Sequence, residues 1–324
     1  MLDPMDIKDQ YDVVVVGGGA AGLNGALMLA RSRRSVLVVD AGEPRNAPAD
    51  GVHGLLGHDG VSPGDLLARG RAEVASYGGV VLPGLVETVR HDDTRFLVDL
   101  ADGRTVAARQ VLVTSGLHDE LPDVPGLAER FGHDVLHCPY CHGWEVRDRA
   151  IGVIATSVHA VHQALLFRQL SDDVVLLRHT APELSPEESE QLAALGIEVI
   201  EGPVVEVVTD GDRLVGVRLE TGEVVAREAL VVAPTMVARS GVVTGLGLSP
   251  VPHPSGLGDH IPVEAGGRTA VPGVWAAGNV TDPAAQVGAA AAAGAMAGAQ
   301  INAELVRQEA AAAVEARRLE VVAR

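Results

Sequence analysis

The sequence contains few aromatic residues and almost no lysine. Only 2% of its 324 residues are Phe, Trp or Tyr, and Lys8 is the single lysine among 25 basic residues. Asp and Glu together number 43, which gives a formal net charge of −18. Nucleic acids and anionic membrane surfaces are bound through clustered Lys and Arg, so no nucleic-acid partner is expected.

Long apolar runs of the kind that enter membranes are also lacking. The first ten residues contain no basic stretch ahead of an apolar run, so we expect no secretory signal and a cytoplasmic protein. Residues 283–302 are uncharged and as long as a membrane span, but they consist mostly of Ala and Gly and include Gln286 and Gln300. This composition favours a buried, tightly packed helix, and no membrane association is expected.

Cysteine is scarce as well, because Cys138 and Cys141 are the only two. Thiols at positions i and i+3 can close a small disulfide ring and cycle between dithiol and disulfide. In a reducing compartment such a pair is more often catalytic or metal-binding than a structural crosslink. A zinc site would need further ligands, and His137 and His142 are too local to complete a tetrahedron, so no metal is expected. Two buried structural cysteines remain an alternative.

Glycine is abundant, and its most informative cluster lies near the N-terminus. A β-branched run at residues 11–16 predicts a buried parallel strand, which leads into the G-x-G-x-x-G turn of Gly17, Gly19 and Gly22. A helix over residues 23–33, a strand over 35–39 and Asp40 follow. This is the dinucleotide-binding pattern, in which the glycines admit a pyrophosphate to the helix N-terminus and the acid binds a ribose. It argues against reading C-x-x-C-H at residues 138–142 as a haem attachment motif.

A second strand–helix–strand pattern predicts a second nucleotide-type domain inserted into the first. Strands are expected at residues 151–154 and 174–177, with helices at 158–170 and 186–195. Further short strands are expected up to residue 232. The predicted fold is therefore α/β, with two Rossmann-like domains, one of them discontinuous; the predicted boundaries are 1–122, 123–239 and 240–324.

A long loop rich in Gly, Pro and His separates residue 43 from a helix expected at residues 63–77. Long irregular segments in compact domains are usually functional, so this loop is expected to line a ligand. Its candidates are Arg45, Asn46, His53 and His58.

Four motifs in this order resemble the low-molecular-weight thioredoxin reductase family. They are the fingerprint at residues 17–40, T-S-G at 114–116, C-P-Y-C at 138–141 and A-A-G-N-V-T-D at 276–282. The resemblance covers nearly the whole chain. It implies a homodimer and an FAD domain built from both ends of the chain, with an inserted domain of NAD(P) type that carries the cysteines.

The resemblance also implies roles for individual residues. Cys141 would lie against the flavin and Cys138 would meet the substrate, while Gly278 and Asn279, in place of the family's Gly-Asp, would bind the ribityl-phosphate part of FAD. Gln286 and Val287, at the start of a helix, would face the pyrimidine end of the flavin. The remaining expected FAD contacts are Gly17, Gly19, Ala20, Ala21, Gly22, Asp40, Ala41, Arg45, Asn46, Thr114, Ser115 and Gly116.

Two departures from the family pattern point to a different reaction. Reductases of the family bind NADPH at a second G-x-G-x-x-A turn, but residues 155–160 here read A-T-S-V-H-A, and the basic cluster is reduced to Arg178 and His179. Binding of NADPH is therefore not expected. His142 replaces the aspartate that moves protons in the reductases, and an imidazole suits that task near neutral pH.

The run C-H-G-W-E, which begins at Cys141, resembles the flavin-dependent dithiol oxidases of gliotoxin-type and holomycin-type antibiotic pathways. The expected function is oxidation of a small-molecule dithiol to a disulfide, with His142 as base, FAD as cofactor and dioxygen as acceptor, which forms hydrogen peroxide. Two alternatives remain open. One is a thioredoxin reductase that uses NADPH or reduced ferredoxin, and the other is a flavin-bound redox sensor without catalytic turnover.

Overall fold

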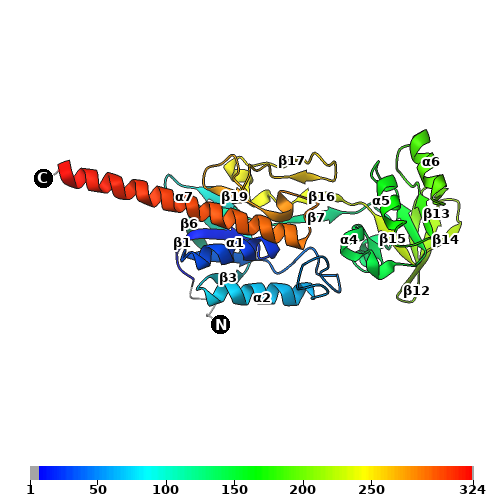
Figure 1. Cartoon of the computed structure of the whole chain (residues 1–324), viewed down its shortest axis with the longest axis horizontal. Helices are drawn as coiled ribbons and strands as arrows, with labels where there is room; N and C mark the ends of the chain where they lie inside the picture. The colour runs from blue at the N-terminus through cyan, green and yellow to red at the C-terminus, as the bar shows by residue number, and fades with distance from the viewer. Residues whose placement is uncertain (1–6, 323–324) are drawn as a thin grey trace. The chain divides into compact units, whose positions relative to one another are not determined.

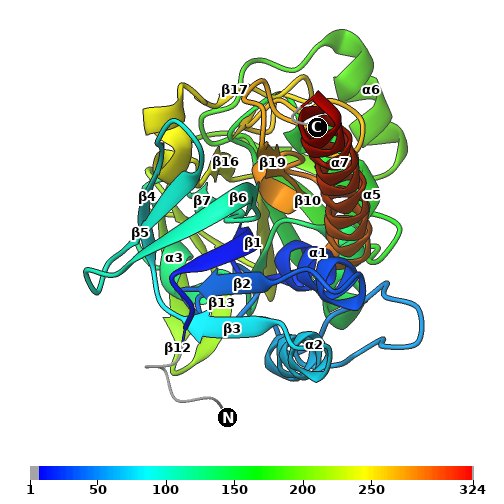
Figure 2. The ribbon, with the colours of Figure 1, turned by 90° about the vertical axis from the view of Figure 1, so that its left-hand side faces the viewer.

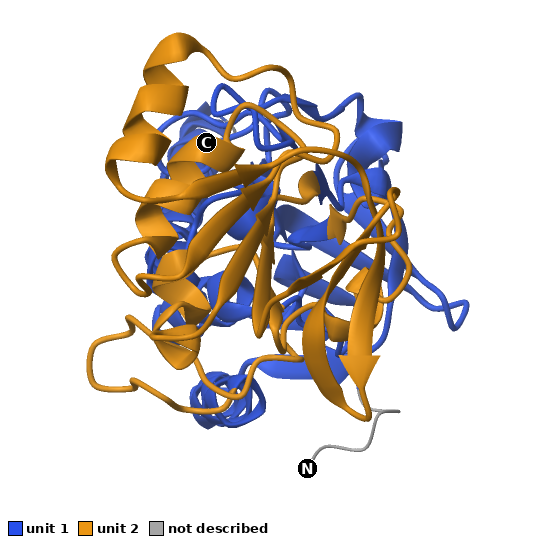
Figure 3. Ribbon diagram, turned by 90° about the vertical axis from the view of Figure 1, so that its right-hand side faces the viewer, with its two compact units in different colours: residues 1–45, 63–118, 237–324 blue, residues 46–62, 119–236 orange. Residues whose placement is uncertain are grey.

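The computed structural model describes residues 7–322, which form two compact units (Figure 3). Within the described part of the chain, unit 1 consists of residues 7–45, Pro63–His118 and residues 237–322. Unit 2 consists of Asn46–Ser62 and Asp119–Met236. The α/β fold with a discontinuous first domain and an inserted second one is confirmed. Residues 46–62, which the sequence assigned to the first segment, are grouped by their contacts with unit 2.

Unit 1 is built on a mixed sheet whose centre is parallel. Its strand order is β3-β2-β1-β6-β5-β4, and β19 pairs with the C-terminal end of β6. The strands β1, β2, β3 and β19 run parallel to their neighbours, whereas β4 and β5 form an antiparallel extension. Their bounds are Gln10–Val16 (β1), Val36–Asp40 (β2), Val80–Pro83 (β3), Val86–His91 (β4), Phe96–Leu100 (β5), Thr105–Val113 (β6) and Val274–Ala276 (β19).

Both faces of this sheet are covered, which explains why its central strands are apolar throughout. Side chains alternate along β1, so Val13 and Val15 pack under the helices while Val14 and Val16 pack on the opposite face. The helices α1 (Ala20–Arg31), α2 (Pro63–Ser76) and α7 (Val287–Val322) cover the first face, and α1 and α7 lie side by side (Figures 1 and 2). The other face is covered by residues of the segment that follows β16 (Thr235–Ala238), which includes η2 (Gly241–Leu246), β17 (Val251–Pro252), β18 (Asp259–His260) and η3 (Gly278–Val280).

The C-terminal helix joins two stretches of the sequence. The pattern predicts a helix in the Ala-rich run of residues 283–302 and a helical tail over residues 304–324, and α7 runs unbroken through both for 36 residues, while residues 323 and 324 lie outside the described part of the chain. Its first half is packed through small residues such as Gly294 and Gly298, as expected for a buried helix. No helix within residues 7–322 is both long enough and apolar enough to cross a bilayer.

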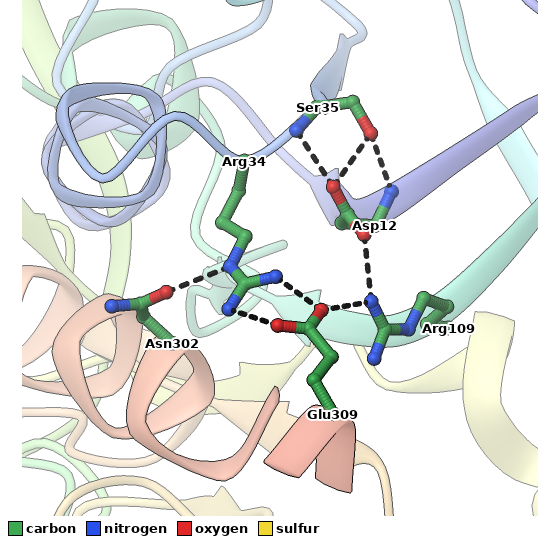
Figure 4. Close-up of polar contacts among 6 residues, drawn as sticks. All are labelled: Asp12, Arg34, Ser35, Arg109, Asn302 and Glu309. Atoms are coloured by element: carbon green, nitrogen blue, oxygen red, sulfur yellow. Dashed lines mark hydrogen bonds and ion pairs between the residues drawn. The ribbon is translucent and has the colours of Figure 1, made fainter. Parts of the chain in front are cut away.

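A polar network holds the second half of α7 to the sheet. The carboxylate of Glu309 accepts hydrogen bonds from Arg34 and Arg109, and Arg109 also bonds to Asp12 at 3.0 Å (Figure 4). Arg34 donates a further hydrogen bond, of 2.7 Å, to the side chain of Asn302. These two arginines lower the pKa of Glu309 from its ordinary value to about 2.

Unit 2 contains a fully parallel sheet in the order β11-β10-β9-β15-β8 and an antiparallel sheet β12-β13-β14. Separate apolar clusters fill the two faces of the parallel sheet. The linking strands β7 (Leu117–Glu120) and β16 pair with each other.

The elements of unit 2 have the following bounds: α3 (Leu127–Arg130), β8 (Val135–Leu136), α4 (Pro139–His142), η1 (Trp144–Val146), β9 (Ile151–Ile154), α5 (Ala160–Phe167), β10 (Val174–Leu177), α6 (Pro186–Ala194), β11 (Glu198–Ile200), β12 (Val204–Asp210), β13 (Arg213–Leu219), β14 (Val224–Ala226) and β15 (Ala229–Val232).

Candidate active site

The glycine turn of unit 1 has the geometry of a pyrophosphate cradle. Gly17 has φ +101°, and a Cβ on Gly22 would lie 1.9 Å from the carbonyl oxygen of Gly17, so side chains are excluded at both positions. Gly19, in contrast, caps α1 without a side-chain hydrogen bond, and nothing lies within 4 Å of the place its Cβ would take. The amides of Ala20, Ala21 and Gly22 open this helix, so the turn offers space and donors to an anion.

Asp40 ends β2 directly beside this turn. Its carboxylate accepts hydrogen bonds from the backbone N–H of Gly18 at 3.1 Å and of Gly42 at 3.3 Å. A Cβ on Gly18 would lie 2.6 Å from the Asp40 carboxyl carbon, so a larger residue at this position would displace the Asp40 side chain. Arg71 of α2 lies 3.7 Å from the same carboxylate. The sequence indicated neither contact, because both depend on how the elements are placed in space.

The T-S-G motif joins the segments of unit 1. The hydroxyl of Thr114 donates to the carbonyl oxygens of Val16 and Gly17, both at 2.9 Å, and that of Ser115 donates to the carbonyl of Arg239 at 2.5 Å. Gly116 has φ +71° and accepts a hydrogen bond from Arg239 N–H. Both hydroxyls therefore bond within the protein and shape the turn, so a ligand at this turn would be bound mainly through backbone groups.

The other end of the chain brings Gly278 and Asn279 to the same place. Gly278 has φ +80°, and a Cβ there would lie 2.8 Å from the Cβ of Ala21. The amide of Asn279 donates to the carbonyl oxygens of Asp282 and Ala285, which shapes the loop before α7. The elements that would hold FAD are thus together in unit 1, and the open space at Gly19 fits its pyrophosphate.

Four expected FAD contacts have less support from the structure. Ala41 and Gln286 are exposed, and Val287 is the first residue of α7 and half-buried. Asn46 belongs to unit 2, whereas Arg45 belongs to unit 1, because the unit boundary falls between them. The involvement of all of these residues in FAD binding stays a prediction.

Cys138 and Cys141 form a disulfide in unit 2, with their Cα atoms 5.3 Å apart. Cys138 caps the short helix α4, Pro139 occupies its first turn, and the N–H groups of Cys141 and His142 both donate to the carbonyl of Cys138. This single turn brings the two sulfur atoms together. No cluster of three or more His, Cys, Asp or Glu side chains suited to a metal is found between residues 7 and 322.

His142 is half-buried, and burial lowers its pKa below the ordinary value of 6.5. The charges of Glu145 and Asp50 oppose this shift, while those of His53 and His133 add to it. An imidazole whose pKa is lowered is neutral near pH 7 and can accept a proton from a thiol.

The loop before α2 supplies part of this environment. Nε2 of His53 lies 3.4 Å from the carboxylate of Glu145, and its Nδ1 lies 3.4 Å from that of Asp59. The sequence also suggests Glu145 as a residue that orients His142; in the structure its carboxylate lies beside His53, and a role toward His142 stays a prediction. His58, the other loop histidine, is exposed. Loop 46–62 therefore contributes to the surroundings of the disulfide.

The nucleotide turn of unit 2 is occupied by its own side chains and amides. The hydroxyl of Thr156, after β9, donates to the carbonyl of Ala233, after β15, at 3.3 Å. The carbonyl of Ala155 accepts hydrogen bonds from the N–H groups of Thr180 and Ala181. The ends of β9 and β15 meet where the strand order reverses, which is the place where doubly wound sheets bind nucleotides.

The two basic candidates after β10 also have internal partners. Arg178 forms an ion pair of 2.5 Å with Glu201, and Nδ1 of His179 accepts a hydrogen bond from the N–H of Val204 at 3.0 Å. Burial lowers the pKa of His179, so it is not a ready cation. A phosphate at this position would meet the negative charge of Glu201.

Several known proteins are similar to this chain in sequence or structure. The crystal structure of HlmI superposes with a TM-score of 0.90 at 47% identity and covers 97% of this chain and 98% of its own. The protein named thioredoxin reductase sirT, of Leptosphaeria maculans, is 30% identical over 90% of this chain and 93% of its own length. A protein named "Probable thioredoxin reductase", of Arthroderma benhamiae, is 31% identical over 53% of this chain, and the chain spans 44% of that relative's length.

The model of the pyridine nucleotide-disulphide oxidoreductase family matches residues 11–299. This range includes the glycine turn, the redox disulfide and the segment around Gly278. Thioredoxin reductase-like members of the family are FAD enzymes. The chain therefore belongs to the pyridine nucleotide-disulphide oxidoreductases, as a thioredoxin reductase-like disulfide oxidoreductase.

Proposed function

We propose that this enzyme oxidises a small-molecule dithiol to a disulfide, with dioxygen as the final acceptor. The observation that carries the proposal is the nucleotide turn of unit 2, which is bridged by Thr156 and Ala233 and has no glycine to admit a pyrophosphate. A thioredoxin reductase takes its electrons at this turn. With the turn closed, the cysteine pair is better suited to receive electrons from a thiol substrate.

The residues of unit 2 carry the thiol chemistry. A substrate thiolate attacks Cys138, the disulfide opens, and a mixed disulfide forms while Cys141 leaves as a thiolate. The second substrate thiol then closes the substrate's own disulfide and releases Cys138. His142 accepts the proton of the attacking thiol, and its lowered pKa keeps it neutral for this step.

When bound, FAD supplies a two-electron acceptor for the dithiol and a route to dioxygen. The glycine turn, Asp40 and the start of α7 would hold it in unit 1. The overall reaction balances as one dithiol and one dioxygen giving one disulfide and one hydrogen peroxide.

Two exposed aromatic side chains close to the disulfide in the sequence support the proposal that the substrate is small and apolar. Tyr140 is 67% and Trp144 is 64% exposed, although the chain contains only eight aromatic residues of the Phe, Trp and Tyr types. Arg147 stacks over the ring of Trp144 at 4.3 Å. Exposed aromatic rings next to reactive sulfur atoms offer contacts to a ring-bearing dithiol.

Anaerobic titration of the purified flavoprotein tests the proposal. We expect a small dithiol to bleach the flavin absorbance and NADPH to leave it unchanged. In air, each dithiol oxidised should yield one hydrogen peroxide. Rapid bleaching by NADPH would refute the proposal, and turnover with reduced ferredoxin and thioredoxin would favour the alternative reductase.

The variant Cys141→Ser tests the cysteine relay, with Cys138→Ser as its matched partner. Both variants should retain FAD, because the elements that hold it belong to unit 1, and both should lose dithiol oxidation. Normal turnover by either variant would show that the disulfide is not on the path of the electrons.

A further inference from the structure

Gln163 connects helix α5 to the residue that precedes the redox disulfide. Its side-chain Nε2 donates a hydrogen bond of 2.7 Å to the backbone carbonyl of His137. The residue is 9% exposed, and its Oε1 is buried and has no hydrogen-bond partner among the residues that the structure describes. In folded proteins a buried acceptor without a donor is uncommon and costs free energy.

The orientation of this amide follows from its partner. A backbone carbonyl can only accept, so the nitrogen of Gln163 must face His137, and the oxygen must be the atom without a donor. Rotating the amide by 180° would bring two acceptors together. The cysteines are joined in this structure, so the unpaired acceptor is observed in the disulfide form of the protein.

The surroundings of Gln163 shield this oxygen from water. The segment that contains the cysteines packs closely on α5 and the residues after it, because a Cβ on Gly143 would lie 2.5 Å from the Leu170 side chain. A disulfide contains no hydrogen-bond donor. Reduction by two electrons and two protons breaks the S–S bond and creates two thiols, each of which can donate, and one of them is Cys138, the residue after His137.

We propose that Gln163 is a positioning residue that stabilises the dithiol form, because its Oε1 accepts a hydrogen bond from the Cys138 thiol once the disulfide is reduced. Stabilising the reduced form makes the disulfide a stronger oxidant, as a dithiol oxidase requires. The inference rests on the proposed function for its purpose. Its measurement does not depend on that function.

The redox equilibrium of the cysteine pair tests the inference. The full-length flavoprotein is equilibrated anaerobically with mixtures of reduced and oxidised dithiothreitol, and free thiols are then trapped with a maleimide reagent that shifts the band on a gel. Because the chain contains only two cysteines, the shift reports Cys138 and Cys141 alone. Gln163→Leu should move the equilibrium about tenfold toward the disulfide, which corresponds to roughly 30 mV.

Gln169→Leu is the matched control, because Gln169 is exposed and lies six residues further along the same segment. It should keep the wild-type equilibrium. An equilibrium of Gln163→Leu equal to wild type, or shifted toward the dithiol, would overturn the inference.

Gln163→Glu tests the acceptor oxygen of residue 163 separately from its donor nitrogen. Glutamate keeps an acceptor oxygen, but once ionised it cannot donate to the carbonyl of His137. We expect its equilibrium to stay at the wild-type position or to move toward the dithiol. If Gln163→Glu shifts toward the disulfide as Gln163→Leu does, the bond to His137 alone explains the effect, and the proposed thiol contact is refuted.

The outcome is distinct from that of the dithiol oxidase proposal. A wild-type flavin that no dithiol bleaches would refute the oxidase, but the trapped thiol ratios of wild type and variants would still be measured. Equal ratios in a protein that does oxidise dithiols would refute only the role of Gln163.

Discussion

Replacing Gly294 by alanine tests how closely α7 packs against α1, the helix that follows the glycine turn. Gly294 and Gly298 of α7 face Ala21 and Gly25 of α1. A Cβ on Gly294 would lie 1.9 Å from the carbonyl oxygen of Ala21 and 2.6 Å from its carbonyl carbon. These are backbone atoms, which cannot rotate away as a side chain can. The two helices must therefore separate or tilt to admit one methyl group.

The expected change in the free energy of unfolding combines two opposing effects. Alanine is favoured over glycine within a helix by about 1 kcal/mol. Overpacking a tight contact costs about 1–3 kcal/mol, and the upper end applies where backbone is struck. We expect a net loss of about 2 kcal/mol, which lowers the melting temperature of a unit of this size by roughly 4–8 °C.

Trp275 provides a reporter that belongs to unit 1 alone. It is 1% exposed, and its indole N–H donates to Gln110 at 2.7 Å. Trp144 is the only other tryptophan, so in a Trp144→Phe background the emission wavelength follows the unfolding of unit 1. Urea titration of this background with and without Gly294→Ala gives the difference directly.

Gly64→Ala is the matched control for this measurement. Gly64 lies in the first turn of α2, and nothing lies within 4 Å of the position its Cβ would take. Its stability should be unchanged or raised by up to about 1 kcal/mol. If Gly294→Ala is as stable as Gly64→Ala, the close crossing of α1 and α7 does not exist as described.

Three further predictions concern FAD, the base and the ion-pair network. Gly19→Ala should fold with wild-type stability, since its Cβ meets open space, but bind FAD roughly tenfold more weakly or worse in a fluorescence titration. His142→Asn should slow flavin bleaching by a dithiol about a hundredfold. In the wild type the bleaching rate should decrease at acid pH only below pH 6.5, because burial lowers the pKa of His142. A decrease that begins above pH 6.5 would contradict this prediction. The carboxylate of Glu309 has its pKa lowered to about 2, so its stabilising contribution is complete above about pH 4.5 and is lost as the pH falls through 2; the difference in urea midpoint between wild type and Glu309→Gln should shrink over that range.

The strands and helices near strong local signals could be predicted from the sequence. The strand, glycine turn, helix and acid of residues 11–40 follow from the alternation of apolar residues and from glycines at fixed spacing, and they occur as β1, α1 and β2. The apolar run at residues 80–89 predicts one strand, but Pro83 and Gly84 divide it into β3 and β4, and Gly84 instead donates to the carbonyl of Asp40. Proline removes a ladder donor, so Pro83 is the signal in the sequence for this break.

The contacts around the disulfide could not be predicted in the same way. Nothing in the local sequence of residues 46–62 indicates that His53 pairs with Glu145, which lies more than ninety residues away. Gln163 lies on a helix whose apolar pattern predicts only which face is buried. That pattern gives no reason for a glutamine at a buried position, and its hydrogen bond to the carbonyl of His137 is seen only in the structure.

Comparison of the two glycine-type turns gives the strongest argument about the direction of electron flow. Both follow a parallel strand and precede a helix, and both lie at the end of a nucleotide-type sheet. In unit 1 the space that a Cβ on Gly19 would enter is open. In unit 2 the loop after β10 donates two amides to Ala155, and Thr156 bridges to Ala233. The missing glycines alone would suggest only a poor nucleotide site. The added hydrogen bonds engage groups at the turn itself, and this supports the proposal that the cysteines receive electrons from a thiol.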